Sequence, residues 1–131
     1  MPVEFCKTDL PGVMLVKTKV FGDSRGYFAE AFSQRDWQAA GIEPRFVQDN
    51  LSCSARGTLR GMHYQIRPNT MGKFVRAVRG ALFDVAVDLR SDSPTFGNWV
   101  GYELSAENAC GLWIPAGFAH GFLALEDDTV A

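Results

Sequence analysis

Two histidines and two cations stand in or beside glycine-rich segments of this 131-residue chain. His63 ends the stretch Leu59-Arg60-Gly61-Met62-His63, Lys73 follows a glycine, and His120 lies in a second glycine-rich stretch at residues 115–121. Histidine titrates near neutral pH, and fixed cations stabilise negative charge that develops on an oxygen. These residue types suit the removal of a carbon-bound proton next to a carbonyl group, with a histidine as base and cations around the enolate oxygen.

The composition bounds the class of protein. With 131 residues, 47% of them hydrophobic, the chain can build one core but not two. The formal net charge of −2 forms no basic stripe for nucleic acid, and there is no apolar run long enough to span a membrane. Cys6, Cys53 and Cys110 are too widely spaced to predict a disulfide scaffold or a zinc knuckle. Because the N-terminus has no secretory pattern, we expect one domain over residues 1–131 in a reducing, cytoplasmic setting.

Short apolar runs separated by Gly, Pro, Asn and Asp predict an all-β fold, an antiparallel sandwich or barrel. The clearest strand covers residues 81–89, where Phe83, Val85, Val87 and Leu89 alternate with Asp84, Ala86 and Asp88. The other predicted strands are 13–20, 27–32, 73–79, 99–104, 111–114 and 121–125. Turns are predicted at residues 22–23, 80, 92–94 and 115. A single helix is predicted over residues 33–40, with Ser33 as N-cap and Gly41 just past its end.

Six sequence blocks, in order, resemble the dTDP-4-dehydrorhamnose 3,5-epimerase family. They are FGDSRGYFAE (21–30), FVQDN (46–50), LRGMH (59–63), FDVAVD (83–88), SPTFG (93–97) and LWIPAGFAHGF (112–122). The resemblance runs from about Val13 to Leu125 and implies a cupin-type jelly roll, the double-stranded β-helix. It also implies a homodimeric isomerase that inverts carbons 3 and 5 of dTDP-4-dehydro-6-deoxy-D-glucose. The product would be dTDP-4-dehydro-L-rhamnose, on the route to dTDP-L-rhamnose.

The resemblance assigns roles to residues that, alone, would be read as solvated charges, a polar loop and a loop histidine. His63 becomes the base at carbons 3 and 5, both α to the carbon-4 ketone, and Lys73 holds the ketone oxygen. The implied contacts to the dTDP-linked 4-keto-6-deoxy sugar, some of them from a neighbouring subunit, are Arg25, Glu30, Gln48, Asn50, Arg60 and His120. Asp84 is a candidate partner for Lys73 or His63 behind the site, whereas Asp49 is left as structural and Asp88 is expected to be exposed.

Arg60 and His63 lie three residues apart, so strict strand alternation would send them to opposite faces. We therefore predict a β-bulge at Gly61 that brings both to one face. A transition metal, the alternative that cupins suggest, needs more ligands than the two histidines here, since Tyr64 and Gln65 follow His63 in place of a His-x-His pair. We expect neither a metal nor a cofactor.

Chains of the family continue beyond the point where this one stops, at Ala131. The resemblance places the proton-donating tyrosine and the carboxylate that orients the base in that continuation. The expectation is therefore a jelly roll without its C-terminal strands and helices, a fragment or truncated relative that is catalytically incomplete. Two alternatives stay open: a non-catalytic nucleotide-sugar-binding or structural fragment, and an epimerase that acts at one centre only.

Overall fold

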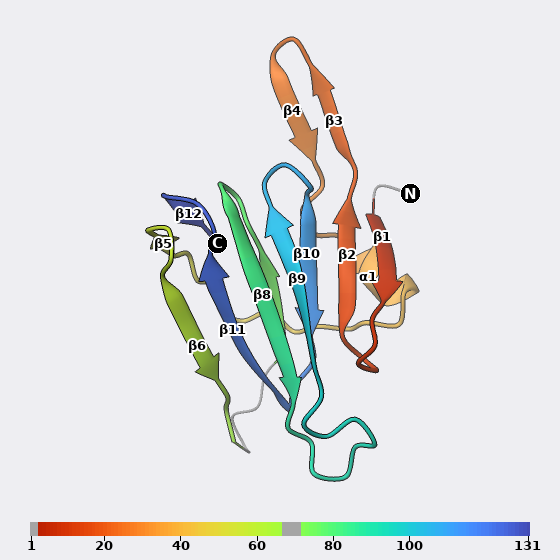
Figure 1. Ribbon diagram of the computed structural model, residues 1–131. Coiled ribbons are helices and arrows are strands. Elements are labelled where there is room, and N and C mark those ends of the chain that lie inside the picture. Colours follow the sequence, from red (N-terminus) through yellow and green to blue (C-terminus); the bar gives the residue numbers. More distant parts are fainter. Residues whose placement is uncertain (1–2, 67–71) are drawn as a thin grey trace.

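Two antiparallel four-stranded sheets form the body of the protein in a computed structural model that describes residues 3–66 and 72–131 (Figure 1). The first sheet has the order β1 (Val3–Lys7), β2 (Met14–Thr18), β10 (Cys110–Ile114), β7 (Lys73–Arg76). The second has the order β6 (Leu59–His63), β11 (Phe118–Ala124), β8 (Ala81–Asp88), β9 (Trp99–Ser105). Two separate two-stranded sheets complete the fold: β3 (Val20–Asp23) with β4 (Gly26–Ala29), and β5 (Cys53–Ser54) with β12 (Thr129–Val130). The prediction of an all-β fold is confirmed.

The main core fills the space between the two sheets. Leu112 and Ile114 from the first sheet pack in one cluster with Leu82, Leu104 and Phe122 from the second, and all are buried. Burial of side chains of this size contributes about 1.5–3 kcal/mol each, so this cluster fixes how the sheets face one another. No helix among the described residues is long and apolar enough to cross a membrane.

The predicted helix is confirmed as α1 (Gln34–Ala39), which covers the outer face of the first sheet. Ser33 is its N-cap, and the Asp36 amide donates to the Ser33 hydroxyl over 3.4 Å. Gly41 follows with a φ of 83°, a conformation that glycine adopts without strain. Trp37, almost fully buried, packs in a second core cluster with Val16 of β2.

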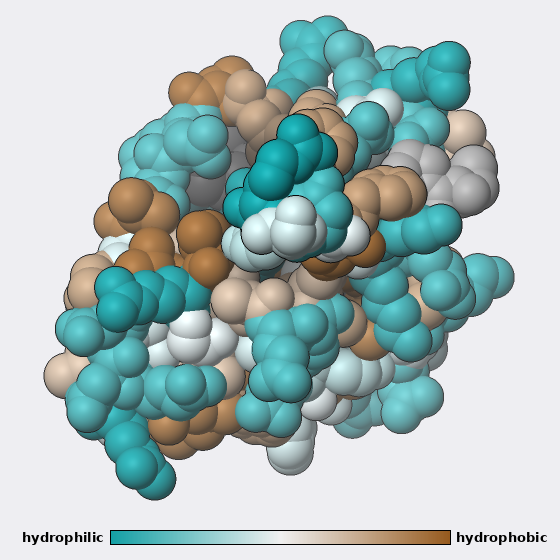
Figure 2. Space-filling model, turned by 90° about the horizontal axis from the view of Figure 1, so that it is seen from above, coloured by the Kyte–Doolittle hydropathy of each residue, from teal (hydrophilic) through white to brown (hydrophobic). Residues whose placement is uncertain are grey.

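A β-hairpin of β3 and β4 projects from the body (Figure 1). The predicted strand 13–20 divides here, since β2 ends at Thr18 and β3 begins at Val20. The predicted turn at residues 22–23 lies inside β3, and the turn itself follows Asp23, whose carboxylate accepts from the Arg25 amide over 2.8 Å. Seen from above, hydrophobic side chains reach the surface in several places between hydrophilic ones (Figure 2).

Strand β8 shows the predicted alternation, but its more buried face is the one that carries the acids. Asp84 and Asp88 are fully buried, whereas Phe83, Val85 and Val87 are half-buried on the outer face. The Phe83 ring packs over Gly101 of β9, where any side chain would collide with it. The expectation that Asp88 is exposed is therefore wrong, because hydrogen-bonding groups of the following loop compensate for its burial.

Candidate active site

A cavity of about 940 Å³ opens between β6 and β11 of the second sheet, β7 of the first, and the segment 46–52. Six of the predicted site residues line it, and they come from four separate parts of the chain. These are Gln48, Asn50, Arg60, His63, Lys73 and His120. Phe46, Phe74 and Phe122 add apolar surface, so the cavity combines a few polar groups with hydrophobic walls, as small-molecule sites commonly do.

The two histidines are direct neighbours across the β6–β11 ladder. His63 pairs with His120, and Arg60 pairs with Phe122, so β6 uses three steps where β11 uses two. The extra residue is the predicted β-bulge, which is confirmed, and it places Arg60 and His63 on the cavity side together. Opposed residues of an antiparallel pair have side chains about 5 Å apart at Cβ, so both imidazoles reach the same space.

Glycine is required where β6 and β11 pass each other at the bulge. A Cβ atom on Gly61 would lie 2.6 Å from Cα of Gly121 and 2.9 Å from the carbonyl oxygen of His120. Gly61 also has a φ of 129°, which residues with side chains rarely adopt. Any side chain at this position would push His63 and His120 apart.

Asp84 lies behind His120 and not, as predicted, against Lys73 or His63. Nε2 of His120 is 2.5 Å from Oδ1 of Asp84, and both side chains are buried. When Asp84 is ionised its carboxylate can only accept, so Nε2 of His120 donates in this contact and Nδ1 is left for other partners. The predicted partner was therefore wrong, although the charge of Lys73 still acts on Asp84.

The surroundings of Asp84 are unusual for a carboxylate. Oδ2 is buried and has no hydrogen-bond partner among the described residues. Burial raises the pKa of Asp84 above its ordinary value, while the hydrogen bond from His120 and the charges of His120 and Lys73 act in the opposite direction. Buried, under-satisfied carboxylates beside a cavity are typical of functional sites.

His63 and Lys73 also share a small recess of about 10 Å³, which has room for about one water molecule. Tyr64, Gln65, Gly117 and Phe118 line the rest of it. The two residues come from opposite sheets, so the sandwich itself sets their spacing. A carbonyl compound bound here would meet an imidazole and an ammonium group at once, which is the arrangement that enolate chemistry needs.

The comparisons with known proteins agree with this geometry. The sequence profile described as dTDP-4-dehydrorhamnose 3,5-epimerase matches residues 7–131. A curated relative from Shigella flexneri with the same name is 57% identical over 123 residues, covering 93% of this chain and 68% of its own. The chain belongs to the dTDP-4-dehydrorhamnose 3,5-epimerase family. It spans about two thirds of the length of the curated relatives it matches.

Two solved structures of the epimerase family are also similar. One, from Legionella pneumophila, is a dTDP-6-deoxy-D-glucose-3,5-epimerase in complex with dTDP-4-keto-L-rhamnose; it is 46% identical with a TM-score of 0.93, covering 98% of this chain and 68% of that one. The other, a 3'-monoepimerase from Streptomyces bikiniensis in complex with dTDP-quinovose, is 37% identical with a TM-score of 0.86, covering 94% and 63%. The fold is thus the cupin-type jelly roll of this family.

The polar loop that precedes β6 carries the predicted nucleotide contacts of this epimerase-family chain. The Gln48 side-chain amide donates to Oδ1 of Asn50 over 3.2 Å, and Nε of Arg60 donates to the Ser54 hydroxyl over 2.9 Å. Both bonds hold polar side chains at the cavity wall and leave further donors for a ligand. Asp49, which the sequence reading left as structural, lines the cavity too.

Arg25 and Glu30 are the predicted substrate contacts that do not line this cavity. Arg25 is on the turn of the β3–β4 hairpin, with an exposed side chain that donates to Asp23 over 2.6 Å, and Glu30 follows β4 and is exposed. The structure therefore does not bring these two together with His63 within one chain.

Sequence reasoning missed Arg76 as a further cation at the cavity. It lies on β7 with Lys73, and because the two lie three residues apart, strand alternation gave no signal that both would line one cavity. Among the described residues, no group of three or more His, Cys, Asp and Glu side chains could hold a metal ion.

Proposed function

We propose that the full-length protein epimerises dTDP-4-dehydro-6-deoxy-D-glucose at carbons 3 and 5 to give dTDP-4-dehydro-L-rhamnose. The observation that carries the proposal is the meeting of His63, His120 and Lys73 on one cavity that Arg60, Gln48 and Asn50 also line. The names of the family's relatives, and the keto-sugar bound to one of them, supply the substrate.

In this proposal His63 removes the proton at carbon 3 and then the proton at carbon 5, each α to the carbon-4 ketone. The electrons of the broken C–H bond form a carbon–carbon double bond, and the carbonyl electrons move onto the oxygen. Lys73 stabilises that enolate oxygen, and the stabilisation is greater in the transition state than for the neutral ketone. A proton then returns to the opposite face of the carbon. By the family resemblance, this proton comes from a tyrosine outside these residues.

His120 contacts the sugar in this proposal, and Asp84 holds its ring by accepting from Nε2. Asp84 touches His120 and not the cavity wall, so it is a positioning residue. Arg60 binds the phosphates of the nucleotide, since an arginine fork matches phosphate oxygens. Gln48 and Asn50 bind the pyrimidine edge or the sugar hydroxyls. No metal or redox cofactor takes part in these steps.

Deuterium wash-in from solvent tests the reaction class. The keto-sugar nucleotide is incubated with the protein in D₂O, and carbons 3 and 5 are followed by proton NMR. The proposal expects deuterium at both carbons and inversion at both. No deuterium at either carbon would instead identify a non-catalytic binding protein.

A one-centre epimerase is the second candidate, because a relative of this chain is described as a 3'-monoepimerase. The same spectra decide between them. Deuterium and inversion at carbon 3 alone would support the second candidate.

We also propose that the protein is a homodimer in which the β3–β4 hairpin reaches the cavity of a second copy. The hairpin exposes Tyr27 and Phe28 at 72% and 70%, and it carries Arg25 away from its own cavity. An exposed aromatic hairpin is a liability for a monomer, and a second copy would cover it. Arg25 and Glu30 would then complete the nucleotide site across the interface.

Mixing two inactive variants tests this arrangement. Arg25→Ala and His63→Asn proteins are each assayed alone and then together after subunit exchange. If Arg25 serves the partner's site, half of all dimers are mixed after exchange and each mixed dimer has one intact site of two, so roughly a quarter of parent activity returns. No recovery, with exchange confirmed by mass, would place Arg25 in its own subunit's site, and parent-like activity of Arg25→Ala alone would place it outside any site.

A further inference from the structure

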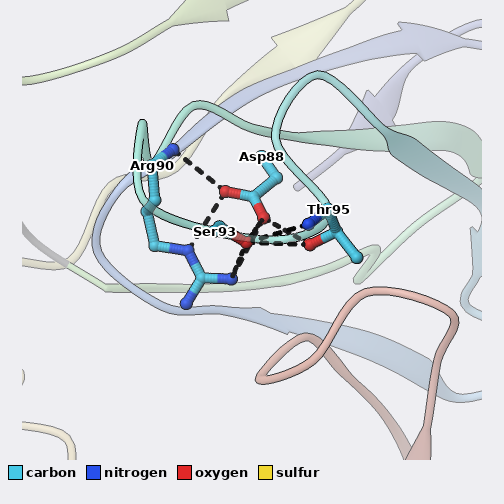
Figure 3. A network of polar contacts seen from close by, with 4 residues as sticks. All are labelled: Asp88, Arg90, Ser93 and Thr95. Atoms are coloured by element: carbon cyan, nitrogen blue, oxygen red, sulfur yellow. Dashed lines mark hydrogen bonds and ion pairs between the residues drawn. The ribbon is translucent and has the colours of Figure 1, made fainter.

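A partly exposed network of polar contacts around the buried Asp88 lies at the end of β8 (Figure 3). Asp88 is fully buried and accepts five hydrogen bonds. Arg90 donates three of them, from its amide at 3.0 Å, Nε at 3.0 Å and Nη2 at 3.1 Å. Ser93 and Thr95 donate the others from their hydroxyls, at 2.6 and 2.5 Å. A side chain held by so many bonds has one orientation, so the Arg90 guanidinium is fixed.

The fixed Arg90 lies directly against the turn that precedes β11. Its guanidinium carbon is 4.6 Å from the centre of the Phe118 ring. A Cβ atom on Gly117 would be only 2.7 Å from Cγ of Arg90, so the arginine stem packs on the glycine. The Leu89 amide also donates to the Gly117 carbonyl over 3.1 Å. Three contacts therefore tie the network to Gly117 and Phe118.

That turn is a wall of the recess between His63 and Lys73. Gly117 and Phe118 both line it, and His120 follows two residues later on β11. A shift of this wall changes the room beside the base and the access of water to it. Misplacement of a substrate by about 1 Å can cost roughly 100-fold in rate.

We propose that Arg90, held by Asp88, is a positioning residue that sets the Gly117–Phe118 wall of the reaction recess. The inference rests on the proposed epimerase function. It predicts that loosening Arg90 lowers the chemical rate without weakening nucleotide binding, since Gln48 and Asn50 line the large cavity but not the recess.

Arg90→Lys tests the proposal, because lysine keeps the charge but cannot make the forked contact with Asp88 or stack flat on Phe118. In the full-length protein we expect kcat to fall roughly tenfold while KM stays within about twofold. The exchange ratio, which is the deuterium in recovered substrate divided by the product formed, should rise because water reaches the recess more easily.

Thr95→Ala is the matched control. This substitution removes one of the five hydrogen bonds to Asp88 but none of those made by Arg90. The variant should therefore be less stable, while its kcat and exchange ratio stay at parent values. If Arg90→Lys fails to fold, Arg90→Gln is compared with the same control.

Parent-like kcat and exchange ratio in the Arg90 variant would overturn the proposal. So would an equal fall in kcat in the Arg90 and Thr95 variants that is in proportion to their loss of stability. A parent protein without activity would overturn the proposed function and this inference with it.

Discussion

Asp84 and Asp88 lie four residues apart on one face of β8, and neither has exposed surface. Asp84 has one bonded oxygen, facing His120, and one without a partner among the described residues. Both oxygens of Asp88 are bonded. Burial alone would raise the pKa of Asp88, but hydrogen bonds from Arg90, Ser93 and Thr95 outweigh it and hold the pKa well below its ordinary value.

The difference separates a carboxylate that serves structure from one that serves a site. Hydrogen bonds compensate for the desolvation of buried Asp88, whereas the desolvation of Asp84, beside the cavity, is only partly compensated. Natural proteins keep such uncompensated groups mainly where function requires them. Substitution of Asp88 should therefore act mainly on stability, and on activity only through Arg90, whereas substitution of Asp84 should act mainly on activity.

The largest effect is expected for the stability of Asp88→Asn. An amide cannot accept all five bonds, and it leaves the Arg90 guanidinium without its partner charge. The free energy of unfolding at pH 7 should fall by about 3 kcal/mol. Urea denaturation measures it, and a loss below about 1 kcal/mol would remove the distinction between the two acids.

The stability that Asp88 contributes should depend on pH in a defined direction. Because its pKa is depressed in the folded state, the contribution is present above the ordinary value of 3.8 and is lost as the pH falls below it toward the folded pKa. The difference between parent and Asp88→Asn should therefore shrink below about pH 4. A constant difference from pH 7 to pH 3 would contradict this.

Activity should respond at Asp84. Asp84→Asn keeps the shape and an acceptor for Nε2 but removes the charge that orients His120. A hydrogen bond to a charged group contributes about 2 kcal/mol, so kcat should fall roughly 30-fold. Steady-state kinetics on the full-length protein measure it, with Thr95→Ala as a variant that should keep its rate.

The smallest effect concerns the stability of the same variant. Since the pKa of Asp84 is raised, its buried charge costs stability above that pKa, and the cost disappears as the pH falls through it. Asp84→Asn should raise the free energy of unfolding at pH 7 by about 1 kcal/mol. Thermal unfolding that shows a loss at neutral pH would place Asp84 with Asp88 as a structural acid.

Part of this picture could be predicted from the sequence. The conflict between the spacing of Arg60 and His63 and strand alternation was enough to predict the bulge. Which face of β8 meets the core could not be predicted, because alternation separates two faces without saying which one is inside. The partners that allow Asp88 to be buried, Arg90 to Thr95, lie in a loop without periodicity.

The partner of Asp84 could not be predicted either. His120 is 36 residues away in sequence, and the contact depends on the β8–β11 register, which only the folded sheet sets. Arg25 was predicted from a block of sequence, but within this chain it lies on the β3–β4 turn and does not line the cavity.

The central claim is that His63 is the base at this cavity, and His63→Asn tests it most directly. The variant keeps a polar side chain on β6 but cannot accept the proton. In the full-length protein we expect the affinity for dTDP to stay within about twofold while deuterium wash-in at carbons 3 and 5 falls at least about 1,000-fold. Wash-in at more than a small fraction of the parent rate, with affinity retained, would show that another group removes the protons.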